Sequence, residues 1–178
     1  EYPIHKRRKD SLDNNDEILF DVNLMAEGHS YYNLGGISIS TNNELCSFGV
    51  DNVSRRIYTI QIKDLKTGEI LPDVIENTTG GSVWSADNKT LFYTRKDETL
   101  RAYQIWKHKL GTDASEDTLV FEEKDDTFSV YVYKSKSREY IIIGSSSTVS
   151  DEYRFISANE PDAEFKIFQE RERDLEYS

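Results

Sequence analysis

Residues 69–111 read EILPDVIENTTGGSVWSADNKTLFYTRKDETLRAYQIWKHKLG and alternate short apolar runs with turn-forming residues. The turn residues lie at Asn77–Gly81, Asp87–Asn88 and Lys96–Glu98. Runs of this length between such turns are typical of antiparallel β-strands. The stretch therefore predicts the last strand of one unit, a Gly-Gly crossing and three strands of the next unit.

The same strand–turn–strand pattern recurs on both sides of this stretch. Residues 40–48 (STNNELCSF) align with residues 85–93 (SADNKTLFY) at a constant offset of 45. A third copy, residues 134–142 (KSKSREYII), aligns at an offset of about 49 from the second. Repeats of roughly 40 to 50 residues with four short strands each are typical of β-propeller blades. From periodicity alone, a β-sandwich with hairpins that look alike by chance stays open.

The repeat divides the chain into half a blade and three whole blades. We expect the outer half of a preceding blade over residues 1–28, blades over 29–77 and 78–125, and a blade with a charged tail over 126–178. The predicted fold class is all-β, a partial β-propeller of about three four-stranded antiparallel blades plus that half-blade. Because a closed propeller usually has at least four blades, we expect a fragment of one propeller domain. Its open edge strands near Tyr2 and Phe165 predict self-association.

Composition indicates packed β structure under an acidic surface. The 178 residues carry a net charge of -11 and are 12% aromatic, with only 3 Pro to interrupt strands. The negative charge argues against a nucleic-acid partner, because phosphates require a basic face. No apolar run approaches the roughly 18 residues that span a bilayer, so no membrane partner is expected. The one cysteine, Cys46, is predicted to be a small buried apolar residue.

No catalytic, metal-binding or cofactor-binding residue is predicted within the chain. The Gly-x-Ser-x-Gly elbow of a serine hydrolase is absent, and its nearest look-alike, Gly144–Thr148, is predicted to be a hairpin loop. The residues around Gly80 lack the Lys and the following helix of a phosphate loop. His5, His29 and His108 have no second ligand at metal-binding spacing. Carboxylates are numerous, but no pair stands out for acid–base catalysis.

Seven strings of residues nevertheless resemble one protein family. They resemble oligopeptidase B (protease II), a group within the prolyl oligopeptidase family, and the similarity covers essentially the whole chain. The strings are LMAEGH (24–29), LGG (34–36), KDLKTG (63–68), LPDVIENT (71–78), LFYTRKDETLR (91–101), WKHKLGT (106–112) and IGSSS (143–147).

The resemblance implies a cytoplasmic serine peptidase of two domains that cleaves short peptides after Arg or Lys. One domain would be a seven-bladed propeller, whose role is to exclude folded proteins, and the other an α/β-hydrolase with a Ser-Asp-His triad. This chain matches only an early part of the propeller. The catalytic α/β-hydrolase domain is absent from it, so no catalytic residue is assigned. A non-catalytic propeller scaffold is the alternative, and the sequence after Ser178 would separate the two.

The loops that follow the second and fourth strands of each blade are expected on one face. This face would carry arginines that could pair with acidic groups of a partner domain. The arginines are Arg55, Arg56, Arg95 and Arg101.

Overall fold

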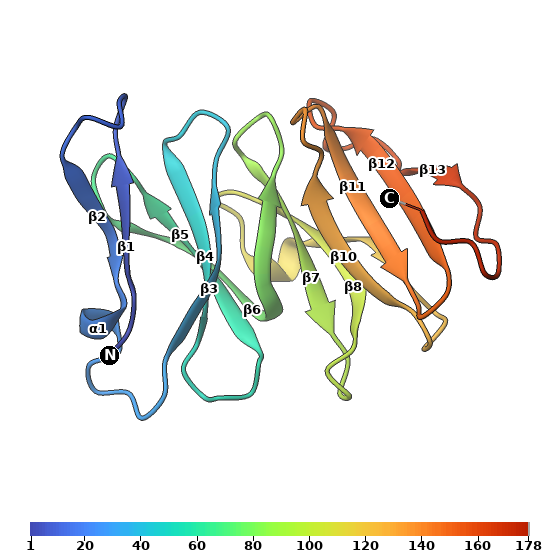
Figure 1. The fold of residues 1–178 in the computed structure, drawn as a ribbon, viewed down its shortest axis with the longest axis horizontal. Coiled ribbons are helices and arrows are strands. Elements are labelled where there is room, and N and C mark those ends of the chain that lie inside the picture. Colours follow the sequence, from blue (N-terminus) through green and yellow to red (C-terminus); the bar gives the residue numbers. More distant parts are fainter. Residues whose placement is uncertain (178) are drawn as a thin grey trace.

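The computed structural model describes residues 1–177, and its regular secondary structure is almost entirely antiparallel strands (Figure 1). Ser178, the last residue of the expected blade and tail, lies outside the described residues. The strands are β1 (Ile4–Arg8), β2 (Asp16–Asp21), β3 (Asn33–Ile39), β4 (Leu45–Asp51), β5 (Tyr58–Asp64), β6 (Ile70–Trp84), β7 (Thr90–Lys96), β8 (Ala102–Lys109), β9 (Thr118–Glu122), β10 (Ser129–Lys134), β11 (Tyr140–Ser146), β12 (Asp151–Ser157) and β13 (Lys166–Gln169). A four-residue helix, α1 (Val22–Met25), follows β2, and a 3₁₀ turn, η1 (Ala114–Glu116), precedes β9.

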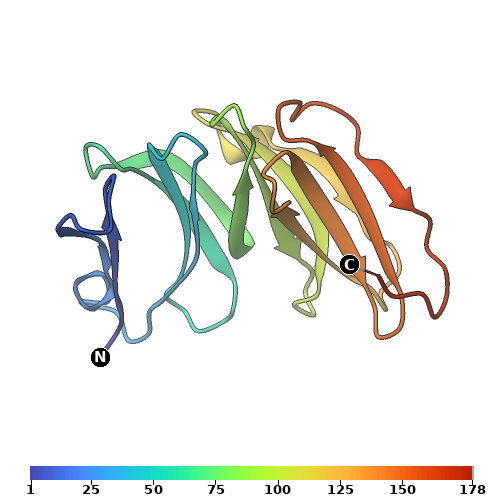
Figure 2. The same ribbon diagram turned by 45° about the horizontal axis from the view of Figure 1, so that its top comes forward.

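The strands pair in chain order into three antiparallel sheets. β1 and β2 form one sheet, β3 to β9 form a second, and β10 to β13 form a third. Figure 2 shows the three sheets side by side, with the chain running from one end of the row to the other. This arrangement is the predicted partial β-propeller, and a row of three sheets differs from the two-sheet β-sandwich that periodicity alone left open.

The middle sheet has seven strands because two four-stranded groups share β6, which is the last strand of β3–β6 and the first strand of β6–β9. Its first half pairs with β5 and its second half with β7. The turn expected at Asn77–Gly81 is therefore a bend within one continuous strand, not a break between two strands. Asn77 and Gly80 have φ angles of 60° and 92°, and the β6–β7 pairing shifts register between Thr78 and Ser82. These left-handed residues bend the strand without ending its hydrogen bonding.

Three hairpins share one geometry, which explains the sequence repeat. Each begins with a serine whose N–H donates to the carbonyl oxygen of the residue five positions on, at 2.9 Å; these serines are Ser40, Ser85 and Ser135. The first offset is therefore 45, as expected, but the second is 50 and not about 49. The alignment that put Lys134 opposite Ser85 was wrong by one residue. Lys134 is instead the last residue of β10.

The core lies between neighbouring sheets. Phe20 of β2 packs on Phe48 of β4, with ring centroids 4.6 Å apart, and Cys46 beside them is fully buried as predicted. Phe92 of β7 packs in the same way against Ile141 of β11. Within residues 1–177, the helical segments are too short to cross a membrane.

Candidate functional site

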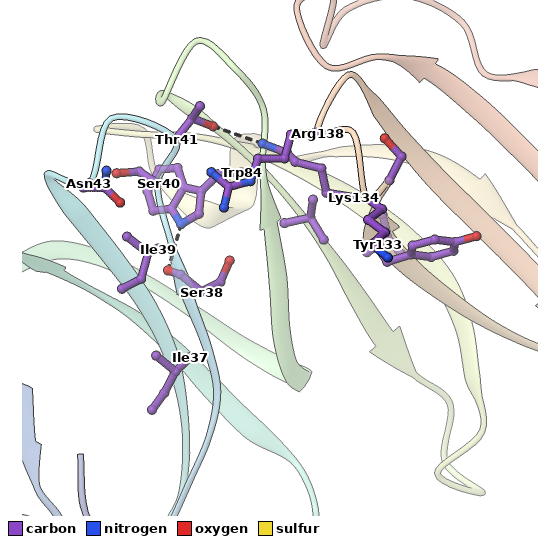
Figure 3. Close-up of a pocket in the computed structure, with 14 residues that line it drawn as sticks. Ile37, Ser38, Ile39, Ser40, Thr41, Asn43, Trp84, Tyr133, Lys134 and Arg138 are labelled. Carbon is purple, nitrogen blue, oxygen red and sulfur yellow. Dashed lines mark hydrogen bonds between the residues drawn. The ribbon is translucent and has the colours of Figure 1, made fainter. Parts of the chain in front are cut away.

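The candidate site is a cleft formed by the first strand of each of three successive four-stranded groups: β3, the second half of β6, and β10. It has a volume of about 550 Å³ and opens beside the shared hairpins (Figure 3). One wall is β3 with its hairpin, the floor is the end of β6, and the other wall is β10 with its hairpin. The lining residues are Ile37–Thr41 and Asn43, then Val83 and Trp84, then Val132–Lys136 and Arg138.

Hydrogen bonds fix the floor of this cleft. Trp84 is 1% exposed, and its indole Nε1 donates to the carbonyl oxygen of Ser38 at 3.1 Å. Ser82, two residues before Trp84 on β6, shares a hydrogen bond with Ser47, and their hydroxyl oxygens are 2.7 Å apart. Because the indole N–H has found a partner, Trp84 can be buried at low cost and can join β6 firmly to β3.

Cations lie along one rim of the cleft. Lys134 Nζ donates to Thr41 Oγ1 at 3.1 Å across the opening, as Figure 3 shows. Burial lowers the pKa of Lys134 and Arg138 lowers it further, while Asp87 acts in the opposite direction. Lys136 and Arg138 are exposed on the same hairpin. The rim is thus a local concentration of positive charge on an acidic protein.

A second polar cluster, around His108, is fully buried and was not foreseen from sequence. His108 Nδ1 lies 2.7 Å from Asp117 Oδ1, and Nε2 lies 3.1 Å from Asp73 Oδ1. Tyr93 Oη donates to the other oxygen of Asp117 at 2.8 Å. Both ring nitrogens are therefore occupied by carboxylates, and the described residues hold no group of three or more side chains suited to a metal ion. The cluster links β6 to β8 and acts as internal support.

A third cluster joins the tail to the last sheet. Glu123 accepts a hydrogen bond from the Ser145 hydroxyl. It also forms an ion pair with Arg171, whose Nη2 lies 2.5 Å from Glu123 Oε2. Ser145 is 1% exposed and lies in β11, so the loop expected at Gly144–Thr148 begins only at Ser147. The reason is that Ser145 and Ser146 still pair with β12. The buried Ser145 hydroxyl is structural.

The arginines expected on one face have different surroundings. Figure 1 shows the loops after β4, β7 and β11 at the same edge, as expected. Arg101, however, bonds Asp97 at 3.1 Å and donates to the carbonyl oxygens of Asp125 and Phe128 at 3.2 and 2.9 Å. Its guanidinium holds the connection between β9 and β10, so Arg101 is engaged within this chain and is less suited than expected to donate to another domain.

The remaining arginines are less engaged. The Arg95 guanidinium stacks on the Trp106 ring, 4.3 Å from its centroid. Arg55 and Arg56 are exposed in the loop after β4, and the Arg56 carbonyl oxygen accepts a hydrogen bond from Lys96 Nζ at 2.5 Å. None of these three arginines forms an ion pair within residues 1–177.

Comparison with known proteins gives a consistent result. Residues 1–178 match the family described as prolyl oligopeptidase, N-terminal beta-propeller domain. The chain is 41% identical to a protein named dipeptidyl aminopeptidase BI from Pseudoxanthomonas mexicana and 34% identical to Protease 2 from Moraxella lacunata. Each alignment covers 99% of this chain but only 27% of the relative. The chain thus spans about a quarter of the length of these relatives.

Solved structures agree with the sequence matches. Oligopeptidase B from Leishmania major superposes with a TM-score of 0.88 at 30% identity, over 96% of this chain and 24% of that one. Oligopeptidase B from Trypanosoma brucei, in a closed form with covalently bound antipain, gives 0.83 at 27% identity, over 92% and 23%.

Proposed function

Since the chain belongs to the prolyl oligopeptidase family, as part of its N-terminal β-propeller domain, we propose that it forms a wall of a gating channel in a serine peptidase. The peptidase would hydrolyse short peptides after Arg or Lys. One observation carries the channel: β3, the end of β6 and β10 all line a single cleft. The first strands of propeller blades surround the central opening, so a cleft lined by three of them belongs to the channel wall.

The gating role follows from geometry. A channel walled by hydrogen-bonded strands has a fixed width, because widening it would separate sheets that share buried residues such as Phe92 and Ile141. A short flexible peptide can pass along such a channel. A folded protein would first have to unfold, which costs its free energy of folding.

The test uses the full-length protein that contains this segment. Short fluorogenic peptides with Arg, Lys, Ala or Pro before the scissile bond are compared by kcat/KM. We expect Arg and Lys substrates to be preferred strongly, and a folded protein that contains the same sequence to resist cleavage. Equal kcat/KM values for all four peptides would contradict the proposed specificity for Arg and Lys. Rapid cleavage of the folded protein would contradict the gating role.

A second candidate activity is release of N-terminal dipeptides. The observation that favours it is the 41% identity to the relative named dipeptidyl aminopeptidase BI. The two activities differ in their need for a free α-amino group. Acetylation of a peptide's N-terminus would abolish dipeptide release but leave cleavage after an internal Arg or Lys intact. A non-catalytic scaffold is the third option, and it predicts no hydrolysis of either peptide.

We further propose that the partners are short basic peptides and an α/β-hydrolase domain, in a cytoplasmic protein. Arg55 and Arg56 lie in the loop after β4, Arg95 lies near the end of β7, and we propose that they pair with acidic groups of that domain. Arg95→Ala should weaken the association of the two domains in low salt. The polypeptide 1–178 alone should self-associate through the open edge at β13, where Phe168 is 70% exposed. Sedimentation of a strict monomer at micromolar concentration would contradict this.

A further inference from the structure

We propose that the cationic rim of the cleft, made by Lys134, Lys136 and Arg138, binds a carboxylate group of the peptide in the channel. The proposal rests on the proposed function for the peptide itself, but the binding of a carboxylate can be measured without cleavage. The shared chemistry is a peptide carboxylate, which a C-terminus or an acidic side chain can supply.

The first support is that the three cations have no carboxylate partner among residues 1–177. Eight of the 22 Lys and Arg side chains form an ion pair within these residues, as Arg101 does with Asp97 and Arg171 with Glu123. The three rim cations are among the fourteen that form none, and all three line the same cleft. Unpaired positive charge in a cleft attracts an anionic ligand from solution.

Asp87, the carboxylate that acts electrostatically on Lys134, already has hydrogen-bond donors of its own. Asp87 affects Lys134 electrostatically, but its carboxylate accepts hydrogen bonds from the backbone N–H groups of Lys89 and Thr90 at 2.8 and 3.0 Å. It also accepts hydrogen bonds from the Ser85 and Thr90 hydroxyl groups. Asp87 is thereby held in its own hairpin and does not bond Lys134.

The second support is the position of Lys134. Its ammonium group is held over the opening by the 3.1 Å bond to Thr41, and it is only partly exposed (Figure 3). An ammonium group can donate three hydrogen bonds, so two donors are left after Thr41 is satisfied. A carboxylate that entered the cleft would meet these donors and the Arg138 guanidinium, which offers a planar fork of donors.

The third support is the backbone conformation of Arg138. This residue has a φ of 66°, in the left-handed region that long side chains adopt at a cost. Asn43 and Asn88 occupy the equivalent position of the other two hairpins, with φ of 61° and 56°, and asparagine tolerates this region well. The third hairpin thus keeps a strained arginine at the mouth of the cleft. Strain of this kind occurs at binding sites, where the side chain has a role beyond the fold.

The experiment measures binding of a peptide that the proposed peptidase would not cut. The probe is a hexapeptide of alternating Ala and Gly with an uncharged coumarin on its N-terminus. It is made as a free acid, as a C-terminal amide, and as an amide with one internal Glu. Binding to the full-length protein is followed by fluorescence anisotropy at low salt. We expect at least one carboxylate form to bind about fivefold more tightly than the plain amide.

Two variants test the rim. Arg138→Asn gives the third hairpin the residue that the other hairpins already carry, so it should fold, and Lys134→Ala removes the central ammonium. Each should reduce the preference for carboxylate to less than about twofold. Lys89→Ala is the matched control, because it removes one exposed lysine from the neighbouring hairpin outside the cleft. It should keep the preference.

The outcomes are distinct. A preference for the free acid alone assigns the C-terminus, and a preference for the Glu peptide alone assigns an acidic side chain; both support the site. Equal binding of all three peptides, or a preference that survives in both rim variants, would overturn it. Hydrolysis of the Arg peptides is measured separately. If the Arg peptides are not hydrolysed but the carboxylate preference is intact, the proposed function is contradicted and the carboxylate site is supported.

Discussion

His108 Nδ1 lies 2.7 Å from Asp117 Oδ1, and both side chains are fully buried. On the opposite side of the ring, Nε2 lies 3.1 Å from Asp73, which also accepts the backbone N–H of Gly111 at 2.5 Å. The imidazole therefore connects the first half of β6 to β8 and to Asp117, the residue just before β9. In a buried position between two carboxylates, a protonated ring satisfies both partners at once.

The first prediction is that this connection weakens as pH rises. Burial disfavours the charged ring, but the hydrogen bonds to Asp117 and Asp73 outweigh it and raise the pKa of His108 above its ordinary 6.5. The stabilisation is therefore fully present below pH 6.5 and is lost as pH rises through the higher folded value. Hydrogen exchange of the Gly111 amide, corrected for intrinsic rates, should show protection that declines across this window.

The variant His108→Gln provides the comparison. The NH2 group of Gln lies at one end of its amide and can replace only one of the two ring nitrogens, so the other carboxylate loses its contact with the ring and keeps only Tyr93 Oη or the Gly111 N–H as a donor. We expect a local loss of about 3 kcal/mol. Across the same pH range the variant should show flat protection at Gly111. A decline as steep as that of the unsubstituted protein would assign the pH dependence to another group.

How far the sequence predicts this protein depends on the distance between interacting residues. Strands, hairpins and the 45-residue offset follow from local patterns, and they were confirmed. The His108 cluster was missed because Asp73 and Asp117 are 35 and 9 residues away, and no spacing rule joins them. The cleft between β3, β6 and β10 was missed for the same reason, since Thr41 and Lys134, on its two walls, are 93 residues apart. Such pairs exist only once the sheets have packed.

The second prediction concerns the close approach of β4 to the bend in β6. A Cβ added at Gly49 would lie 2.5 Å from the Gly80 Cα, and both are backbone positions that cannot turn aside. Gly49→Ala should therefore destabilise the protein by about 1 to 3 kcal/mol, measured by chemical denaturation. Gly81→Ala is the control, because its Cβ would meet no atom within 4 Å. Equal free energies of unfolding for the two variants would show that β4 and the bend in β6 are not in close contact.

The third prediction is that Cys46 is chemically inert in the folded protein. Burial raises the pKa of its thiol to about 11, so almost no thiolate is present at pH 8. Iodoacetamide should leave the peptide that contains Cys46 unmodified, as read by mass spectrometry, until denaturant is added. Phe20→Ala removes the ring that packs on Phe48 beside the thiol and should accelerate modification. Rapid alkylation without the substitution would show that β1 and β2 open readily.

The last prediction concerns the charged tail, which Arg171 fixes to the last sheet. Its guanidinium lies 3.5 Å from the centroid of the Phe128 ring and forms the ion pair with Glu123 described above. Arg171→Ala would leave the Glu123 carboxylate buried without a cation, at a cost of about 3 kcal/mol. Limited digestion by a protease that cuts after Glu should then cleave at Glu170 and Glu172 far sooner. Arg173→Ala is the control, because that side chain is 91% exposed and should change nothing.

The pH dependence of the Arg171 variant separates charge from packing. Burial opposes ionisation of Glu123, but Arg171 and the hydrogen bonds from Ser145 and the Asp125 N–H lower its pKa below the ordinary 4.5. In the unsubstituted protein this stabilisation is present above pH 4.5 and is lost as pH falls through the lower folded value. Without Arg171 the carboxyl should protonate more easily, so the difference between variant and parent should shrink in acid. A difference that stayed constant with pH would assign the effect to the stacking on Phe128 instead.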